Sequence, residues 1–266
     1  MNEEITRHIE EIERMVRIDE LMKEWATYCH SQKPTCCHSP KPIFVEDGPF
    51  PYYWNQKIKI LFIGRELYGK RNENDPLTIK YWDEREGMQK LGVFQSRLLY
   101  LAYGILHGEC SEEAWEKMDT ATKLNSVFAT GKNEAFSYAF MNASKILNED
   151  SSKVGEVFTA FVNDKVNRAF FVREIELLAP DIIISGNLND LRFWEFEEFK
   201  ARLKQHNDRN CHKDDCFVWK YEIGGKTILL LDGHHFSARG ETFEKFYEPI
   251  CKVAKVFLDE DNFKLN

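Results

Sequence analysis

The first group of residues with chemical potential directly follows an apolar run. Residues 64–69 read Gly-Arg-Glu-Leu-Tyr-Gly and follow residues 58–63. Such a run predicts a buried strand, and the carboxyl ends of strands are where ligands bind in open α/β sheets. A carboxylate there, Glu66, can orient or deprotonate a water molecule or stabilise a developing cation. The alternative is a surface carboxylate that pairs with Arg65 or with a helix terminus.

A second group follows residues 228–231, which are also apolar. Residues 234–240 read His-His-Phe-Ser-Ala-Arg-Gly. A neutral imidazole of His235 can donate a hydrogen bond to developing negative charge. In the alternative interpretation, His234 packs in the core while His235 caps the final helix or bonds to backbone.

A third predicted strand end supplies Asn142, whose amide offers both a donor and an acceptor and can therefore read a nucleobase edge. Turn chemistry alone also favours asparagine at such a place. Taken in order, residues 64–69, Asn142 and residues 235–239 resemble the motifs of the uracil-DNA glycosylase superfamily. The family's first motif is Gly-Gln-Asp-Pro-Tyr-His, and its last motif begins His-Pro-Ser and often includes an arginine. The resemblance extends over about residues 57–258.

The resemblance implies a role for each matching residue in hydrolysis of an N-glycosidic bond, in DNA or in a nucleotide. Glu66 would position the water, and His235 would stabilise the leaving pyrimidine anion at O2. The base would have to leave the stack to reach such a pocket, and DNA repair is the process implied. Substrate binding would involve Gly64, Arg65, Tyr68, Asn142, Ser237 and Arg239, with Tyr68 beside the pyrimidine C5 and Asn142 on the base.

The sequence departs from the family pattern at three positions. Glu66 stands where the family has the shorter aspartate, and Leu67 and Phe236 replace prolines. One extra methylene can displace a carboxylate by about an ångström, which can cost on the order of a hundredfold in rate. A non-catalytic nucleotide or nucleic-acid binding module of the same fold is therefore the alternative function.

An ester hydrolase of the SGNH type is a further alternative. Residues 186–190, Gly-Asn-Leu-Asn-Asp, and the Asp232 to His235 spacing look like blocks of that class. Its mechanism requires a serine nucleophile on the first strand-end loop. Residues 64–69 contain no serine, and asparagines at 187 and 189 also suit a turn and a helix cap.

Seven cysteines occur, an odd number that fits reduced thiols or metal ligands better than a disulfide framework. Thiolates suit zinc, and the zinc candidates are Cys29, Cys36, Cys37, Cys211 and Cys216. Their spacings match neither standard zinc patterns nor the four-cysteine iron–sulfur cluster of some glycosylases. Reduced thiols in loops are the simpler interpretation, and no cofactor is predicted.

Composition limits the classes of function. The chain has 266 residues, a net charge of -8 and a pI near 5.6, so nucleic-acid binding would need a local basic patch. No stretch approaches the roughly 20 apolar residues of a membrane span, and the amino terminus lacks an apolar signal region. We expect a cytoplasmic protein without a membrane partner.

Alternating apolar runs and helical periodicities predict a three-layer α/β/α sandwich with a mainly parallel central sheet. Residues 1–50 are expected to form an amino-terminal helix and a Cys/Pro-rich loop packed on the core, and residues 51–266 the glycosylase-like domain. Gly224-Gly225 predicts a hairpin turn. Helices are expected at about 3–28, 88–107, 151–178, 191–203 and 240–258, with another starting at Ser111, and strands at 57–63, 136–141, 180–186, 217–223 and 227–231.

Overall fold

The structure is a computed structural model that describes residues 3–32, 42–50, 52–69, 78–80, 93–108, 111, 137–148, 156–205, 216–238 and 243–259. The chain divides into two compact units. The first comprises Met1–Pro49, Ile63–Asp83 and Phe140–Ala179, and the second comprises Phe50–Phe62, Glu84–Ala139 and Pro180–Asn266. The loop after residue 63 and the loop after residue 142 therefore belong to the first unit, and the His235 loop belongs to the second.

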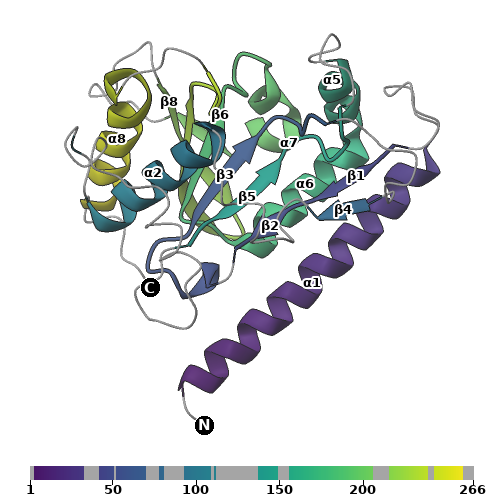
Figure 1. Cartoon of the computed structure of the whole chain (residues 1–266), viewed down its shortest axis with the longest axis horizontal. Coiled ribbons are helices and arrows are strands. Elements are labelled where there is room, and N and C mark those ends of the chain that lie inside the picture. Colours follow the sequence, from purple (N-terminus) through teal and green to yellow (C-terminus); the bar gives the residue numbers. More distant parts are fainter. Residues whose placement is uncertain are drawn as a thin grey trace. The chain divides into compact units, whose positions relative to one another are not determined.

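The first unit is built around a long amino-terminal helix. Its elements are α1 (Glu3–Ser31), β1 (Phe44–Glu46), β2 (Gly48–Pro49), β4 (Thr78–Lys80), α5 (Glu156–Asn163) and α6 (Lys165–Leu178). Helix α1 contacts both α6 and β1 (Figure 1). Strand β1 pairs in parallel with β4, so that Phe44 lies opposite Thr78.

The core of the first unit is centred on Trp25 of α1, which is fully buried. Its ring stacks on Phe170 of α6 at 5.4 Å between centroids, and it also contacts Phe44 and Phe161. The indole N–H donates to Asn167 Oδ1 at 2.8 Å. A buried indole is best accommodated where its N–H finds an acceptor, and Asn167 supplies it here.

The second unit carries the hairpin and the carboxyl-terminal helix. Its elements are η1 (Tyr53–Asn55), α2 (Val93–His107), β6 (Ile182–Gly186), η4 (Phe193–Glu195), α7 (Glu197–Lys200), β7 (Leu203–Gln205), β8 (Cys216–Ile223), β9 (Lys226–Gly233), η5 (Phe243–Tyr247) and α8 (Glu248–Asp259). Helix α2 contacts α8, and α8 contacts β9 (Figure 1).

The predicted hairpin is confirmed. Strands β8 and β9 are antiparallel, with Ile223 opposite Lys226. Gly224 and Gly225 have φ values of 57° and 78°, the left-handed region that both central residues of a two-residue hairpin turn occupy and that glycine enters without strain.

Two further strands have residues in both units: β3 (Ile60–Gly64) and β5 (Ala139–Asn142). The larger sheet has the order β2-β5-β3-β6-β9-β8-β7 and is mostly parallel, while β8 pairs antiparallel with both of its neighbours, β9 and β7. Every described residue of β3, β5 and β6 is buried, as expected for strands covered on both faces. The protein thus has an α/β fold with a mixed sheet flanked by helices.

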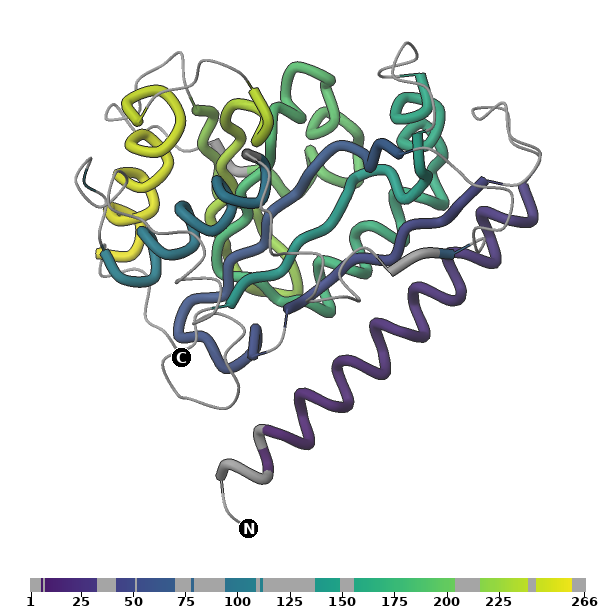
Figure 2. Tube along the Cα trace, in the orientation of Figure 1, coloured from purple at the N-terminus to yellow at the C-terminus, as the bar shows by residue number. Residues whose placement is uncertain are grey.

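The expected single helix over 151–178 is wrong. The chain forms α5 and α6 with a break at Asp164, and the path through this break can be followed in Figure 2. Asp164 has an extended backbone, and its carboxylate accepts the Val166 N–H at 2.8 Å. This is N-cap geometry. The apolar periodicity continues through the break and therefore concealed it.

The expected helix over 191–203 is also wrong. Only η4 and the single helical turn α7 form there, Leu203 already belongs to β7, and Arg192 has φ of 57°. Three large side chains in this segment, Phe193, Trp194 and Phe199, are almost completely buried and contact one another. Two short turns bring these rings together, whereas residues 193, 194 and 199 do not share one face of a regular helix.

Two segments in which no strand was predicted contain short strands. Strands β1 and β2 lie in the proline-rich segment 29–50, and β4 lies within 68–87. Strand β2 includes Pro49 and is an edge strand in the sheet order, where a missing backbone donor is tolerated. The rest of both segments, and the helix expected from Ser111, fall largely outside the described residues.

The final helix begins later than expected. A five-residue π-helical turn, Phe243–Tyr247, precedes α8, and Pro249 is the second residue of α8. Proline is favoured in the first turn of an α-helix because that turn has no use for its missing N–H. No helix among the described residues has the length and apolar character needed to cross a membrane.

Candidate functional site

The loop after β3 lies beside the loop after β5. The N–H of Ala143 donates to Gly64 O, and the N–H of Ser144 donates to Arg65 O, both at 2.9 Å. A Cβ on residue 64 would lie 2.8 Å from the Phe140 ring and 3.0 Å from Asn142 Oδ1. Only glycine fits there, so the predicted motif begins with a residue that this close approach requires.

Glu66 forms a compact cluster with its neighbours in sequence. The Tyr68 hydroxyl donates to Glu66 Oε1 at 2.6 Å, and Arg65 Nη2 donates to the Tyr68 hydroxyl at 2.7 Å. Arg65 Nε lies 3.0 Å from Glu66 Oε2, although its N–H is not aligned for a hydrogen bond. One oxygen of a fully buried carboxylate is thus left with an ionic contact and no hydrogen-bond donor from the described residues.

Tyr68 is the exposed member of this cluster, with 40% of its surface accessible. Partial burial, and then the hydrogen bond to Glu66, raise the pKa of its hydroxyl. The hydroxyl therefore stays protonated and acts as a donor to the carboxylate. Tyr68 is tied to the β5 side of the unit by the bond from Asn148 N–H to Leu67 O at 2.8 Å.

Asn142 ends β5 and is 3% exposed. Asp47 Oδ2 accepts both the Asn142 backbone N–H at 2.6 Å and the side-chain Nδ2 at 3.2 Å. A carboxylate accepts hydrogen bonds and an amide nitrogen donates them, so the contact fixes which end of the amide faces Asp47. The first unit thus brings together Gly64, Arg65, Glu66, Tyr68 and Asn142.

His235 lies in the loop after β9, in the second unit. Its Nδ1 accepts the backbone N–H of Ser237 at 3.3 Å and lies 2.8 Å from Ser237 Oγ. A backbone N–H can only donate, so Nδ1 is unprotonated and the neutral ring carries its proton on Nε2. The backbone N–H of Ser237 therefore binds the imidazole ring of His235. Arg239 lies outside the described residues.

The His235 loop is anchored by its neighbours from α2. Arg97 Nη1 donates to the carbonyls of Phe236, at 3.1 Å, and Ala238, at 2.7 Å. Phe236 is fully buried and packs edge-on against Phe62 and Phe94. An apolar anchor thus stands where the family pattern has proline.

The aspartate that the ester-hydrolase alternative pairs with His235 is already engaged. Asp232 accepts hydrogen bonds from Ser185 Oγ and from the backbone N–H groups of Leu188, at 2.9 Å, and Asn189, at 2.8 Å. Burial raises the pKa of Asp232 to about 6 despite these donors. Its observed contacts hold the loop after β6, which speaks against that alternative.

The described residues include no group of three or more His, Cys, Asp or Glu side chains placed to hold a metal ion. The thiol of Cys29 lies 3.7 Å from Asn167 Oδ1, and that of Cys216 lies 3.5 Å from the Phe217 carbonyl. Cys36, Cys37 and Cys211 lie outside the described residues, so the zinc hypothesis for them is untested.

A pocket of about 450 Å³ in the second unit lies at the β8–β9 turn and contains none of the predicted site residues; it is lined by Ala201, Arg202, Glu222, Ile223, Gly224, Gly225 and Thr227. It lies at the amino end of β9, whereas the predicted loops follow the carboxyl ends of their strands. The strand-end loops are the better candidate because their polar groups are buried and oriented.

Sequence reasoning missed three buried residues that contact one another, Asp47, Lys145 and Glu174. Asp47 is the one that bonds to Asn142. One feature of the sequence indicates that Glu174 is buried: it lies on the apolar face of the predicted helix, which also carries Phe170, Phe171 and Leu178. A charged residue on a buried helix face needs a partner. The other two lie in segments without periodicity, where nothing in the sequence indicates burial.

The fold and these geometries define an α/β protein with oriented polar groups at its strand ends. No protein-family model matches the chain, and no curated protein gives a significant sequence match.

Proposed function

We propose that this protein binds a nucleobase and hydrolyses its N-glycosidic bond, in the manner of uracil-DNA glycosylases. The observation that carries the proposal is the Asn142 amide, which is buried, fixed by Asp47 and placed beside Gly64 at the start of the Glu66 loop. An oriented amide at the end of β5 and a buried carboxylate on the adjoining loop offer base recognition and water activation within the same unit.

The carboxylate chemistry of this proposal rests on Glu66 Oε2. Because Tyr68 occupies Oε1, Oε2 is the oxygen left to accept a hydrogen bond from an attacking water. An ionised carboxylate there would also offset positive charge that develops on the sugar.

The imidazole chemistry rests on the tautomer of His235. With Nδ1 accepting from Ser237, Nε2–H is the donor, and a neutral donor can stabilise an anionic leaving base without first giving up its proton. The proposal assigns this role to His235, and Arg65 and Arg239 to phosphate or substrate contact.

A non-catalytic base- or nucleotide-binding module is the second candidate, and one observation favours it. Glu66 is held by Tyr68 and Arg65 with its side chain fully buried. A carboxylate held in this way can serve to shape a pocket without activating water.

Release of uracil from single- and double-stranded oligonucleotides tests the proposal. We expect release by the wild type, and a loss of at least a hundredfold in Glu66→Gln and in His235→Ala. Glu24→Gln and His8→Ala are matched controls because both residues are exposed on α1, and they should retain full activity. Uracil or oligonucleotide binding without release by the wild type would support the binding module. Neither binding nor release would refute both.

A further inference from the structure

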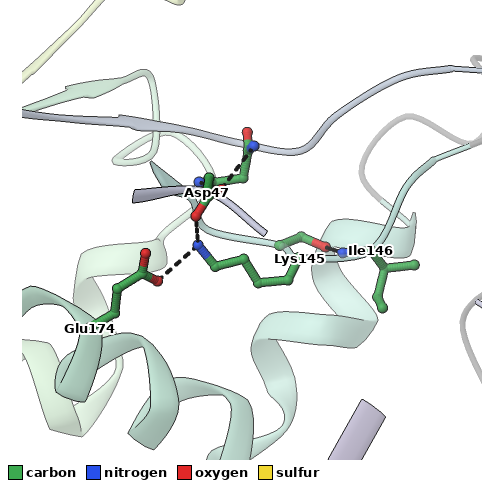
Figure 3. Close-up of polar contacts among 6 residues, drawn as sticks. Asp47, Lys145, Ile146 and Glu174 are labelled. Carbon is green, nitrogen blue, oxygen red and sulfur yellow. Dashed lines mark hydrogen bonds and ion pairs between the residues drawn. The ribbon is translucent and has the colours of Figure 1, made fainter. Parts of the chain in front are cut away.

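A buried charge cluster lies directly behind Asn142. Lys145 Nζ lies between the carboxylates of Asp47 and Glu174, as Figure 3 shows. The Lys145–Glu174 contact is 2.8 Å, and all three side chains are completely buried. The cluster brings together the segment before β2, the loop after β5 and α6. Trp25 of α1 lies beside it, with Lys145 Nζ 5.3 Å from the centre of the indole ring.

The charge balance of this cluster identifies the ionised acid. Two carboxylates and one ammonium would leave a net buried negative charge, which is strongly unfavourable. Burial raises the pKa of Glu174 to about 8, so this acid holds its proton at neutral pH. Burial raises the pKa of Asp47 as well, but this carboxylate accepts from Lys145 and from two N–H groups of Asn142, and these donors favour its carboxylate form. Lys145⁺ and Asp47⁻ therefore form a neutral pair.

We propose that Asp47 is a positioning residue that locks the Asn142 amide in one orientation and thereby selects which nucleobases the site accepts. An ionised carboxylate cannot donate to the amide oxygen, so Asn142 cannot turn its Oδ1 toward Asp47. Lys145 keeps Asp47 ionised, and the ionised carboxylate holds the Asn142 amide in this orientation. The inference rests on the proposed function, because it assumes that Asn142 reads the base.

The locked amide defines the base edge that it fits. One N–H of Nδ2 is used by Asp47, which leaves the other N–H and Oδ1 for the ligand. Such an edge pairs with a carbonyl oxygen next to a ring N–H, as in uracil, thymine, hypoxanthine and guanine. Cytosine and adenine present an amino group next to a ring nitrogen acceptor, and would require the reversed amide. The site should therefore prefer keto bases.

Asp47→Asn tests the lock with little change in shape. The new side chain is an amide that can face Asn142 with either its oxygen or its nitrogen, so both orientations of Asn142 become available. Lys145 keeps Glu174 as a partner, which then ionises, so the cluster stays neutral. We expect the preference for uracil over cytosine to fall about tenfold. It is measured as the ratio of dissociation constants for free uracil and free cytosine, and as release from matched oligonucleotides.

Glu174→Gln is the matched control, because it makes the same acid-to-amide change in the same cluster but leaves the Lys145–Asp47 pair intact. It should keep the wild-type preference within about twofold, as expected for a group that does not touch Asn142. Thermal unfolding shows whether both variants fold. If Asp47→Asn does not fold, Asp47→Ser supplies the test, with the same loss of preference expected.

A second measurement reports the lock without any ligand. In ¹⁵N-labelled protein, the Asn142 side-chain NH₂ resonances, assigned by their loss in Asn142→Asp, should be protected from solvent exchange in wild type and in Glu174→Gln, and unprotected in Asp47→Asn. A folded Asp47 variant with unchanged preference and unchanged protection would overturn the role of Asp47 while leaving the proposed function standing. If the wild type neither binds nor releases any base, the proposed function fails and the selectivity fails with it.

Discussion

Glu174 is a buried acid whose protonation should govern how stability depends on pH. Its pKa is raised by burial from 4.5 to about 8 in the folded chain, so between these values the folded state binds more protons than the unfolded state. The free energy of unfolding must then fall as pH rises through this window, and this group adds no further change above it.

Replacing Glu174 with glutamine should remove this dependence. Between about pH 5 and pH 8, we expect wild type to lose on the order of a few kcal/mol of stability relative to Glu174→Gln. Urea unfolding at several pH values measures the difference. The exposed Glu13, on α1, provides the control substitution. A constant difference between wild type and Glu174→Gln across the window would show that Glu174 is ionised throughout.

In the candidate site, residue types predict the loops but not the hydrogen-bond partners of their side chains. The Glu66 and His235 loops were recognisable because their ionisable side chains follow apolar runs. Their partners were not, because Asp47 lies 95 residues before Asn142 and Ser237 acts on His235 through its backbone N–H. Hydrogen bonds of these kinds leave no periodic mark in the sequence.

At the scale of elements, the break between α5 and α6 matters because Asp164 serves both α6 and α1. Its Oδ1 accepts the Val166 N–H, and its Oδ2 accepts the Tyr28 hydroxyl at 2.7 Å. A cap that also joins two helices explains why the chain interrupts an otherwise continuous apolar face.

Asp164→Ala should lower the free energy of unfolding by about 1–2 kcal/mol, because it removes the helix cap and leaves the partly buried Tyr28 hydroxyl without this acceptor. Chemical denaturation measures the loss. Tyr28→Phe, which removes the second bond only, should cost about half as much, and Asp190→Ala on the exposed loop after β6 should cost little. Equal stability of Asp164→Ala and wild type would contradict the capping role.

The elements that were predicted well are of two kinds: strands made of apolar runs, and a turn whose backbone conformation favours glycine. Strands β3, β6 and β9 are apolar runs. The turn at Gly224-Gly225 needs positive φ values, which glycine adopts without strain. The segment 191–203 was predicted wrongly because Phe193, Trp194 and Phe199, which do not share one helix face, are buried by two short turns. Those turns depend on packing against the rest of the unit and not on a local period.

At the scale of the whole molecule, the net charge of -8 bears on how nucleic acid would bind. An acidic chain offers no general attraction to phosphates, so recognition under the proposed function must depend mainly on the base.

The affinity for a uracil-containing single-stranded oligonucleotide should therefore depend only weakly on salt. With about two phosphate contacts, raising NaCl from about 50 to about 200 mM should weaken binding less than about tenfold. Fluorescence anisotropy titrations measure this, with an abasic oligonucleotide of equal length as the control. A loss of about a thousandfold would instead indicate an extensive basic surface.

The sequence by itself determined the α/β class, the buried strands, the hairpin and the two loops that carry Glu66 and His235, because apolar runs and glycine pairs act locally. Only the tertiary structure decided that Asp47 holds the Asn142 amide, that Lys145 lies between Asp47 and Glu174, and that His235 carries its proton on Nε2. The reason is physical: burial follows from side-chain type, whereas the partner of a buried polar group depends on which distant segments the folded chain brings together.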